Sequence, residues 1–226
     1  PHERAKMGIS RTFQKIELFM GATVLDNIRL GRHIHLRSGL LSGSIYLGKT
    51  AREEVELRDF IEREIIDLLE IEPIRDKGVG MLPYGLQKRV ELARALALNP
   101  KVILLDEPLA GLNLEEVEDM ARFILDINEE ERWQTTCVLV EHDMGVVMDI
   151  SHRVMALNFG ERIAEGPPQE VQKDPRVIQA YLGEAEDLYV SREGIRDLGS
   201  HHLETVLRER EEDRPGHGYP GFEAGR

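Results

Sequence analysis

The chain has 226 residues, of which 41% are hydrophobic and 31% charged, enough for one sizeable core or a core with a small subdomain. Its 42 acidic residues outnumber 29 basic ones, and the net charge is −13 at pH 7. Because non-specific nucleic-acid binding relies on Lys and Arg neutralising phosphates, this balance argues against a nucleic-acid partner. No apolar run approaches the roughly 18 residues of a membrane-spanning helix, and a single cysteine, Cys137, excludes an internal disulfide.

The first part of the chain predicts one short strand and two helices. Residues 9–13 predict the strand, and residues 24–30 predict a helix in which Asp26 favours the N-terminus. A longer amphipathic helix is expected after Thr50, which fits an N-cap, and Pro73 ends it. Its apolar stripe is formed by residues at helical spacing, namely Leu57, Ile61, Ile65, Leu68 and Leu69.

The second half predicts further strands and short helices. Four segments have the patterning of strands, at residues 102–106, 135–140, 153–157 and 162–166. A turn at residues 158–160 joins the last two strands, and packing is the expected role of Cys137 in the second. Pro168 opens a short helix, and Pro175 opens another that ends near Gly183.

Two acidic residues mark the end of the apolar strand at residues 102–106. This strand suits a position buried on both faces of a parallel sheet, and open α/β sheets bind ligands at the carboxyl ends of such strands. Asp106 is then placed to hold Mg²⁺ through water, and Glu107 to orient or deprotonate an attacking water. Taken alone, the pattern favours a strand that simply ends in a solvated Asp-Glu-Pro turn.

Four further motifs occur in a fixed order around this acid pair: residues 11–14 (RTFQ), 82–87 (LPYGLQ), 110–113 (AGLN) and 141–143 (EHD). In this order they resemble the glutamine loop, the signature loop, the loop after the magnesium acids and the histidine switch of ATP-binding cassette (ABC) transporter ATPases. The resemblance runs from about residue 9 to residue 183. It implies an α/β fold of the P-loop NTPase type with a helical subdomain at about residues 50–100.

The family resemblance assigns a role to individual residues. It implies that Asp106 and Gln14 hold Mg²⁺ through water, that Glu107 is the catalytic base, and that His142 and Gln14 position the γ-phosphate and the attacking water. The signature loop of this family binds ATP held by the opposite subunit, and the helix N-terminus and backbone N–H groups supply the contacts. Here Pro83 replaces the usual Ser of that loop, so Tyr84 and Gly85 are its expected nucleotide-binding residues. The resemblance adds Asn113, from the loop after the magnesium acids.

Further residues narrow the resemblance to one of the two ATPases of branched-chain amino acid importers. They are residues 18–19 (LF), 23–27 (TVLDN), 141–144 (EHDM) and 180–184 (AYLGE). The lipopolysaccharide-export ATPase shares the YLGE ending and is the alternative within the family. Either implies a cytoplasmic subunit that works with a sister ATPase beneath two membrane permease subunits, and an importer adds an external substrate-binding protein.

The phosphate-binding loop of the family precedes the glutamine loop by a few tens of residues, whereas thirteen residues precede Gln14. We therefore expect the N-terminal phosphate-loop segment to be absent, and this chain alone to be inactive as an ATPase. A competing interpretation is a fragment that cannot hold ATP itself and only donates its signature loop. Residues 43–50 (GSIYLGKT) fit the phosphate-loop pattern, but the polar, basic residues before them do not suit the buried strand that the motif needs.

The predicted domain organisation has two parts. Residues 1–183 form the ATPase domain without its phosphate-loop segment, and residues 184–226 form a highly charged extension that is partly helical or disordered. The resemblance does not cover this extension.

Overall fold

The computed structural model describes residues 2–32, 55 and 58–186. They form two compact units that divide between His152 and Arg153. Several sequence-based predictions lie outside the described residues: the cap at Thr50, the stripe residue Leu57, the phosphate-loop match at residues 43–50 and the extension beyond Glu186.

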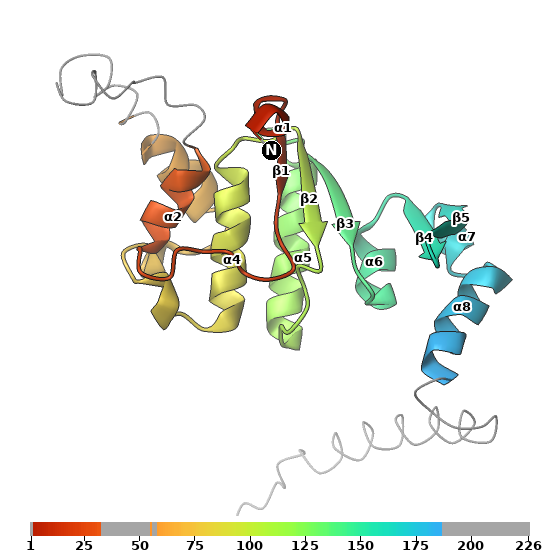
Figure 1. The fold of residues 1–226 in the computed structure, drawn as a ribbon. Helices are drawn as coiled ribbons and strands as arrows, with labels where there is room; N and C mark the ends of the chain where they lie inside the picture. The colour runs from red at the N-terminus through yellow and green to blue at the C-terminus, as the bar shows by residue number, and fades with distance from the viewer. Residues whose placement is uncertain (1, 33–54, 56–57, 187–226) are drawn as a thin grey trace, which may run out of the picture. The chain divides into compact units, whose positions relative to one another are not determined.

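Unit 1 contains a three-stranded parallel sheet (Figure 1). Its strands lie side by side in the order β1 (Ile9–Arg11), β2 (Val102–Asp106) and β3 (Thr136–Val140). Ile103 at the centre is paired with Ser10 on one side and Cys137 on the other. Because all three strands run in the same direction, their carboxyl ends meet at one edge of the sheet. The three strands confirm the sequence prediction to within two residues.

The helices of unit 1 pack around this sheet and beside one another (Figure 1). They are α1 (His2–Lys6), α2 (Val24–Gly31), α4 (Tyr84–Leu96), α5 (Leu114–Glu129) and α6 (Met144–Ile150). Local chemistry fixes their starts: the hydroxyl of Thr23 accepts a hydrogen bond from the backbone N–H of Asp26 at 3.1 Å, which caps α2. The predicted helix at residues 24–30 is therefore confirmed.

The stripe that follows residue 60 is buried but is wound differently from the prediction. Ile61, Ile65 and Leu69 are fully buried, as expected for a core face. Residues Ile61–Ile66 (η2) form a π-helical turn rather than an α-helical one. Apolar residues repeat here at every fourth position, a spacing that a wider turn keeps on one face. Pro73 lies in the first turn of a short 3₁₀ helix, Glu72–Ile74 (η3), so the preceding helix ends before Pro73, as predicted. Another 3₁₀ turn, Val79–Met81 (η4), leads to α4.

One face of the sheet forms the core with α4 and α5. Ile103 and Leu105 of β2 are buried with Leu96 of α4 and with Phe123 and Ile127 of α5. Side chains of the opposite face are more accessible: Val138 and Val140 of β3 are 46% and 58% exposed. This asymmetry follows from the alternation of side chains along each strand.

Unit 2 is a β-hairpin followed by two helices. Its elements are β4 (Val154–Asn158), β5 (Glu161–Gly166), α7 (Pro168–Val171) and α8 (Pro175–Glu186). The strands pair antiparallel, and Phe159 and Gly160 join them with positive φ angles of 47° and 81°. Val154, Ala164, Val171 and Val177 are buried. The predicted hairpin and both proline-initiated helices are confirmed, with α8 continuing three residues beyond Gly183. In the described residues, no helix is long and apolar enough to cross a membrane.

Candidate nucleotide site

Asp106 ends the central strand and is fixed there by its neighbours. Its carboxylate Oδ2 accepts a hydrogen bond from the guanidinium of Arg11 at 2.7 Å, and its backbone N–H donates to Oγ1 of Thr12 at 3.4 Å. Parallel pairing places Arg11 opposite Leu104, which brings the end of β1 close to the end of β2. The carboxylate that the sequence assigns to Mg²⁺ thus lies at the ligand-binding edge of the sheet.

Glu107 adopts a strained backbone conformation. Its φ angle is 47°, in the left-handed region that costs a non-glycine residue about 1–2 kcal/mol. Its backbone N–H donates to the carbonyl of Val140 at 2.9 Å, and its own carbonyl accepts from Nζ of Lys88 at 3.0 Å. Lys88 comes from α4 and is only 3% exposed. Two separate elements therefore hold Glu107 in this conformation, which re-aims its side chain where the strand ends.

Gln14 reaches the second acid. Its amide Nε2 donates a hydrogen bond to Oε2 of Glu107 at 2.9 Å, although 93 residues separate them in sequence. The structure thus brings together three of the predicted site residues, Gln14, Asp106 and Glu107.

The loop that carries Gln14 is held at both ends by α4. The buried carboxylate of Glu91 accepts a hydrogen bond from the backbone N–H of Phe13 at 3.4 Å, and the guanidinium of Arg94 donates to the carbonyl of Glu17. Burial raises the pKa of Glu91, while backbone hydrogen bonds and the nearby Lys88 oppose this shift. A single helix therefore supports both Glu107, through Lys88, and Gln14.

His142 projects into solvent between two acidic residues that make backbone hydrogen bonds. The carboxylate of Glu141 is 1% exposed and accepts a hydrogen bond from the backbone N–H of Leu109 at 2.8 Å. Asp143 caps α6 by accepting from the backbone N–H of Gly145 at 2.9 Å. The His142 side chain is 77% exposed, with Nδ1 3.7 Å from Oε2 of Glu141. Among the described residues, its ion pair is with Glu141, and no hydrogen bond joins it to Glu107.

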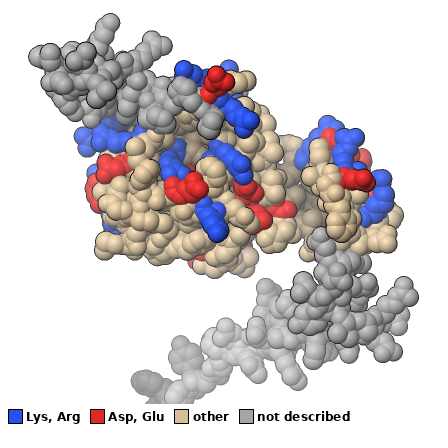
Figure 2. Space-filling model, in the orientation of Figure 1, with Lys and Arg blue, Asp and Glu red and all other residues tan. Residues whose placement is uncertain are grey.

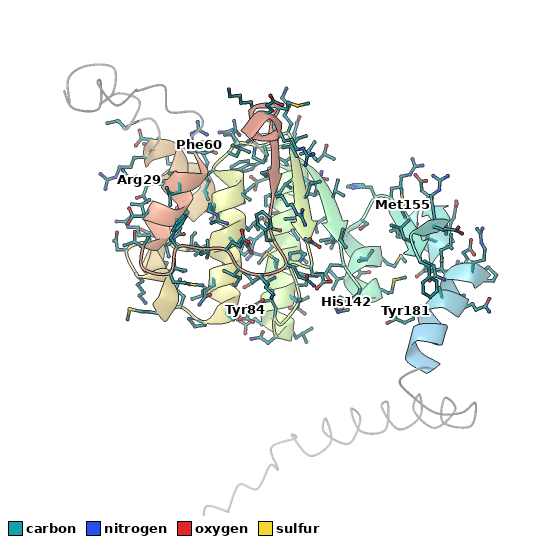
Figure 3. All side chains as sticks on the ribbon, in the orientation of Figure 1. Arg29, Phe60, Tyr84, His142, Met155 and Tyr181 are labelled. Carbon is teal, nitrogen blue, oxygen red and sulfur yellow. The ribbon has the colours of Figure 1, made fainter. Side chains whose placement is uncertain are left out.

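The signature segment opens α4 at the same end of the sheet. Figure 3 shows Tyr84 and His142 on this side, where β2 and β3 end, whereas Phe60 lies near the opposite end. The ring of Tyr84 packs against Gly111, where an added Cβ would lie 3.1 Å from the ring. An added Cβ on Gly85 would lie 2.1 Å from a carboxylate oxygen of Glu116, so Gly85 permits close approach of α4 and α5. Both predicted residues lie at the start of α4, and Nζ of Lys88, which contacts the carbonyl of Glu107, lies 5.7 Å from the centre of the Tyr84 ring.

Asn113 has a structural role that its motif does not reveal. Its side chain accepts a hydrogen bond from the backbone N–H of Glu116 at 3.0 Å, and Glu116 accepts in return from the backbone N–H of Asn113 at 3.0 Å. This reciprocal capping box starts α5. The sequence pattern Asn-x-x-Glu at residues 113–116 could have predicted this capping box.

Sequence reasoning missed four charged residues that support the site: Lys88, Glu91, Arg94 and Glu141. Lys88, Glu91 and Arg94 follow one another at intervals of three residues in α4, so consecutive members are neighbours on the helix surface. Their contacts, to the loop after β1 for Glu91 and Arg94 and to Glu107 for Lys88, join distant parts of the chain, which no local pattern indicates.

Comparison with known proteins identifies the family. A family model described as ABC transporter matches residues 1–110, and one described as branched-chain amino acid ATP-binding cassette transporter matches residues 161–187. The high-affinity branched-chain amino acid transport ATP-binding protein LivG of Salmonella typhimurium is 40% identical over 185 residues, which are 80% of this chain and 70% of LivG. The chain belongs to the ATP-binding subunits of ABC transporters. Its α/β cassette fold, first inferred from motif order, is thereby confirmed.

Other relatives place the cassette within this family. The corresponding protein BraF of Pseudomonas aeruginosa is 37% identical over 186 residues, covering 81% of this chain and 71% of BraF. The crystal structure of the ADP conformation of MJ1267, an ATP-binding cassette of an ABC transporter, matches with a TM-score of 0.64 at 30% identity, covering 81% and 71% of the two chains. The lipopolysaccharide export ATP-binding protein LptB of Haemophilus influenzae is 33% identical over 183 residues, or 81% of this chain and 68% of LptB.

Proposed function

We propose that this cassette, when completed by a phosphate-binding loop, hydrolyses ATP to drive the import of branched-chain or other hydrophobic amino acids. The observation that carries the proposal is the assembled acid pair, in which Glu107 is held in a strained conformation beside Gln14 while Asp106 ends the central strand. Strained residues held by several neighbours are typical of functional sites. Family membership supports ATP as the nucleotide.

The oxygen donors at the sheet edge fit Mg²⁺. This cation is usually bound in proteins through one or two carboxylates together with substrate phosphates and water, and Asp106 supplies such a carboxylate. The proposed role of Asp106 and Gln14 is to hold Mg²⁺ through water. When bound, the cation would neutralise phosphate charge during phosphoryl transfer.

Glu107 is the proposed general base. Its carboxylate is partly exposed and accepts a hydrogen bond from Gln14, so the two side chains can share one water in place of their direct contact. The exposed His142 is proposed to position the γ-phosphate, which requires its ring to leave Glu141 and turn towards the acid pair. Tyr84, Gly85 and Asn113 are the proposed contacts to a nucleotide held by the opposite subunit.

The proposed partners follow from the family. A sister ATPase would complete the nucleotide sandwich, and two membrane permease subunits would bind the cassette at the cytoplasmic face of the membrane. An external substrate-binding protein would deliver the amino acid. The importer assignment is supported by the family model at residues 161–187 and by higher identity to LivG and BraF than to LptB.

The test is ATP-dependent uptake of leucine into proteoliposomes that contain the complete transporter with this subunit. We expect uptake and phosphate release to be lost together in Glu107→Gln, whose side chain keeps the shape but not the basicity of glutamate. Arg153→Gln, which removes a surface charge in unit 2, serves as the control and should retain both activities. ATP hydrolysis without leucine uptake would contradict the substrate; hydrolysis that survives in Glu107→Gln would contradict the assigned base.

A further inference from the structure

Arg11 forms an ion pair with the carboxylate that the proposed function gives to Mg²⁺. Its guanidinium lies 2.7 Å from Oδ2 of Asp106, and the two side chains are 53% and 30% exposed. The guanidinium donates a hydrogen bond to this carboxylate oxygen, which makes the contact a charge-assisted one. A hydrated dication would need this same carboxylate.

The backbone around the pair restricts how Asp106 can respond. Asp106 is the last residue of β2, paired with Val140 of β3, and its N–H contacts Thr12. Arg11 is the last residue of β1 and its guanidinium lies 5.3 Å from the centre of the Phe13 ring, a cation–π distance. Both partners thus start from rigid strand ends, and the long Arg11 side chain is the one that can move.

Among the described residues, the ion pairs of Arg11 and Asp106 are with each other. Figure 2 shows basic and acidic side chains interspersed on the visible face of unit 1. Removing Arg11 therefore changes the charge directly beside Asp106 without dismantling a wider network. The hydrogen bond from Gln14 to Glu107 does not involve Arg11.

We propose that Arg11 competes with divalent cations for Asp106 and so lowers the affinity of this site for free metal. The inference rests on the proposed function, which assigns Asp106 to Mg²⁺. Arg11 must release the carboxylate before a cation can use it, and its positive charge also repels the cation. Nucleotide phosphates add further oxygen ligands, so metal arriving with the nucleotide overcomes this competition better than free metal does. Arg11 thereby favours entry of the metal as its nucleotide complex.

The test measures Mn²⁺ binding to the chain without nucleotide, by electron paramagnetic resonance titration. Exposed ion pairs of this kind are weak, so we expect Arg11→Gln to bind Mn²⁺ about twofold to fivefold more tightly than the unsubstituted chain. Arg11→Lys, which keeps the positive charge, should bind Mn²⁺ with an affinity close to that of the unsubstituted chain. The gain should vanish when Asp106→Asn is added to Arg11→Gln.

Arg153→Gln is the matched control, because Arg153 also forms a 2.7 Å ion pair with a carboxylate, that of Glu165, and the change in net charge is the same. It should leave Mn²⁺ affinity unchanged. An equal gain in Mn²⁺ affinity in Arg11→Gln and Arg153→Gln would overturn the proposal. So would an unchanged or weaker Mn²⁺ affinity in Arg11→Gln, or no detectable Mn²⁺ binding by the unsubstituted chain and Arg11→Gln. The titration contains no nucleotide and no transporter, so its result is independent of leucine uptake. Failure of the Arg11 proposal can therefore be distinguished from failure of the proposed function.

Discussion

The close contact between α2 and α4 predicts that replacing Gly31 by alanine lowers the free energy of unfolding. Gly31 is the last residue of α2, and an added Cβ would lie 2.1 Å from the backbone carbonyl oxygen of Arg94 and 3.1 Å from Cβ of Ala97. The first distance involves backbone and cannot be relieved by rotating a side chain. Gly31→Ala therefore forces the two helices apart by about 1 Å, since real Cβ contacts are essentially never shorter than 3.0 Å.

Two opposing energies determine the size of the effect. Overpacking of this kind costs about 1–3 kcal/mol, and a clash with backbone belongs near the upper value. Replacing a helical glycine by alanine stabilises by about 1 kcal/mol at most. We expect a net loss of about 2 kcal/mol in the free energy of unfolding, which corresponds to a fall in Tm of roughly 4–8 °C for a chain of this size.

Thermal unfolding followed by circular dichroism measures this loss. Gly21→Ala is the matched control, because no atom lies within 4 Å of its added Cβ, and it should change stability by less than about 0.5 kcal/mol. An unchanged or raised Tm in Gly31→Ala would refute the close approach of α2 to α4. Since Arg94 also holds the loop that carries Gln14, the same variant should lower ATP turnover by the complete transporter.

Three further outcomes are expected. Burial raises the pKa of Glu91, so its contribution to stability is fully present below the ordinary glutamate pKa of about 4.3 and is lost as pH rises through the raised value. Relative to Glu91→Gln, the unsubstituted chain should therefore lose stability between about pH 4 and pH 7. A stability difference between the two chains that does not change with pH would contradict this. Asn113→Ala should lower the free energy of unfolding by about 1 kcal/mol through loss of the α5 cap, whereas Asn113→Asp should retain it; equal urea midpoints for the two would argue against the cap. Burial raises the pKa of Cys137 to about 11, so at pH 8 its thiol should react with Ellman's reagent far more slowly than after unfolding, and equal rates would show that the thiol is accessible.

Sequence pattern predicted the elements of this cassette because their signals are local. The apolar run at residues 102–106 needs a buried strand wherever it is placed, and prolines at positions 168 and 175 can start helices without information from distant residues. Motif order then indicated the family, which the relatives confirm. The π-helical turn at η2 was not predicted, because a stripe at every fourth residue is compatible with either winding.

The candidate site was predicted only in part. The acid pair and Gln14 carry recognisable motifs, and the structure brings Gln14 within hydrogen-bonding distance of Glu107. Lys88 and Glu91 carry no such motif; they reach the site because α4 packs beneath the ends of β1 and β2. No local pattern indicates that the Glu141 side chain is buried and the His142 side chain exposed, although the two residues are adjacent.

The sequence by itself therefore determined which segments become strands and helices, which residues can carry nucleotide chemistry, and to which family the chain is related. The tertiary structure alone decided the ion pair of Arg11 with Asp106, the strained conformation of Glu107 and the support that α4 gives to Glu107 and to the Gln14 loop. The physical reason is distance along the chain. Helix and strand signals act over a few residues, whereas Arg11 and Asp106 are 95 residues apart and meet only because parallel pairing places their strand ends side by side.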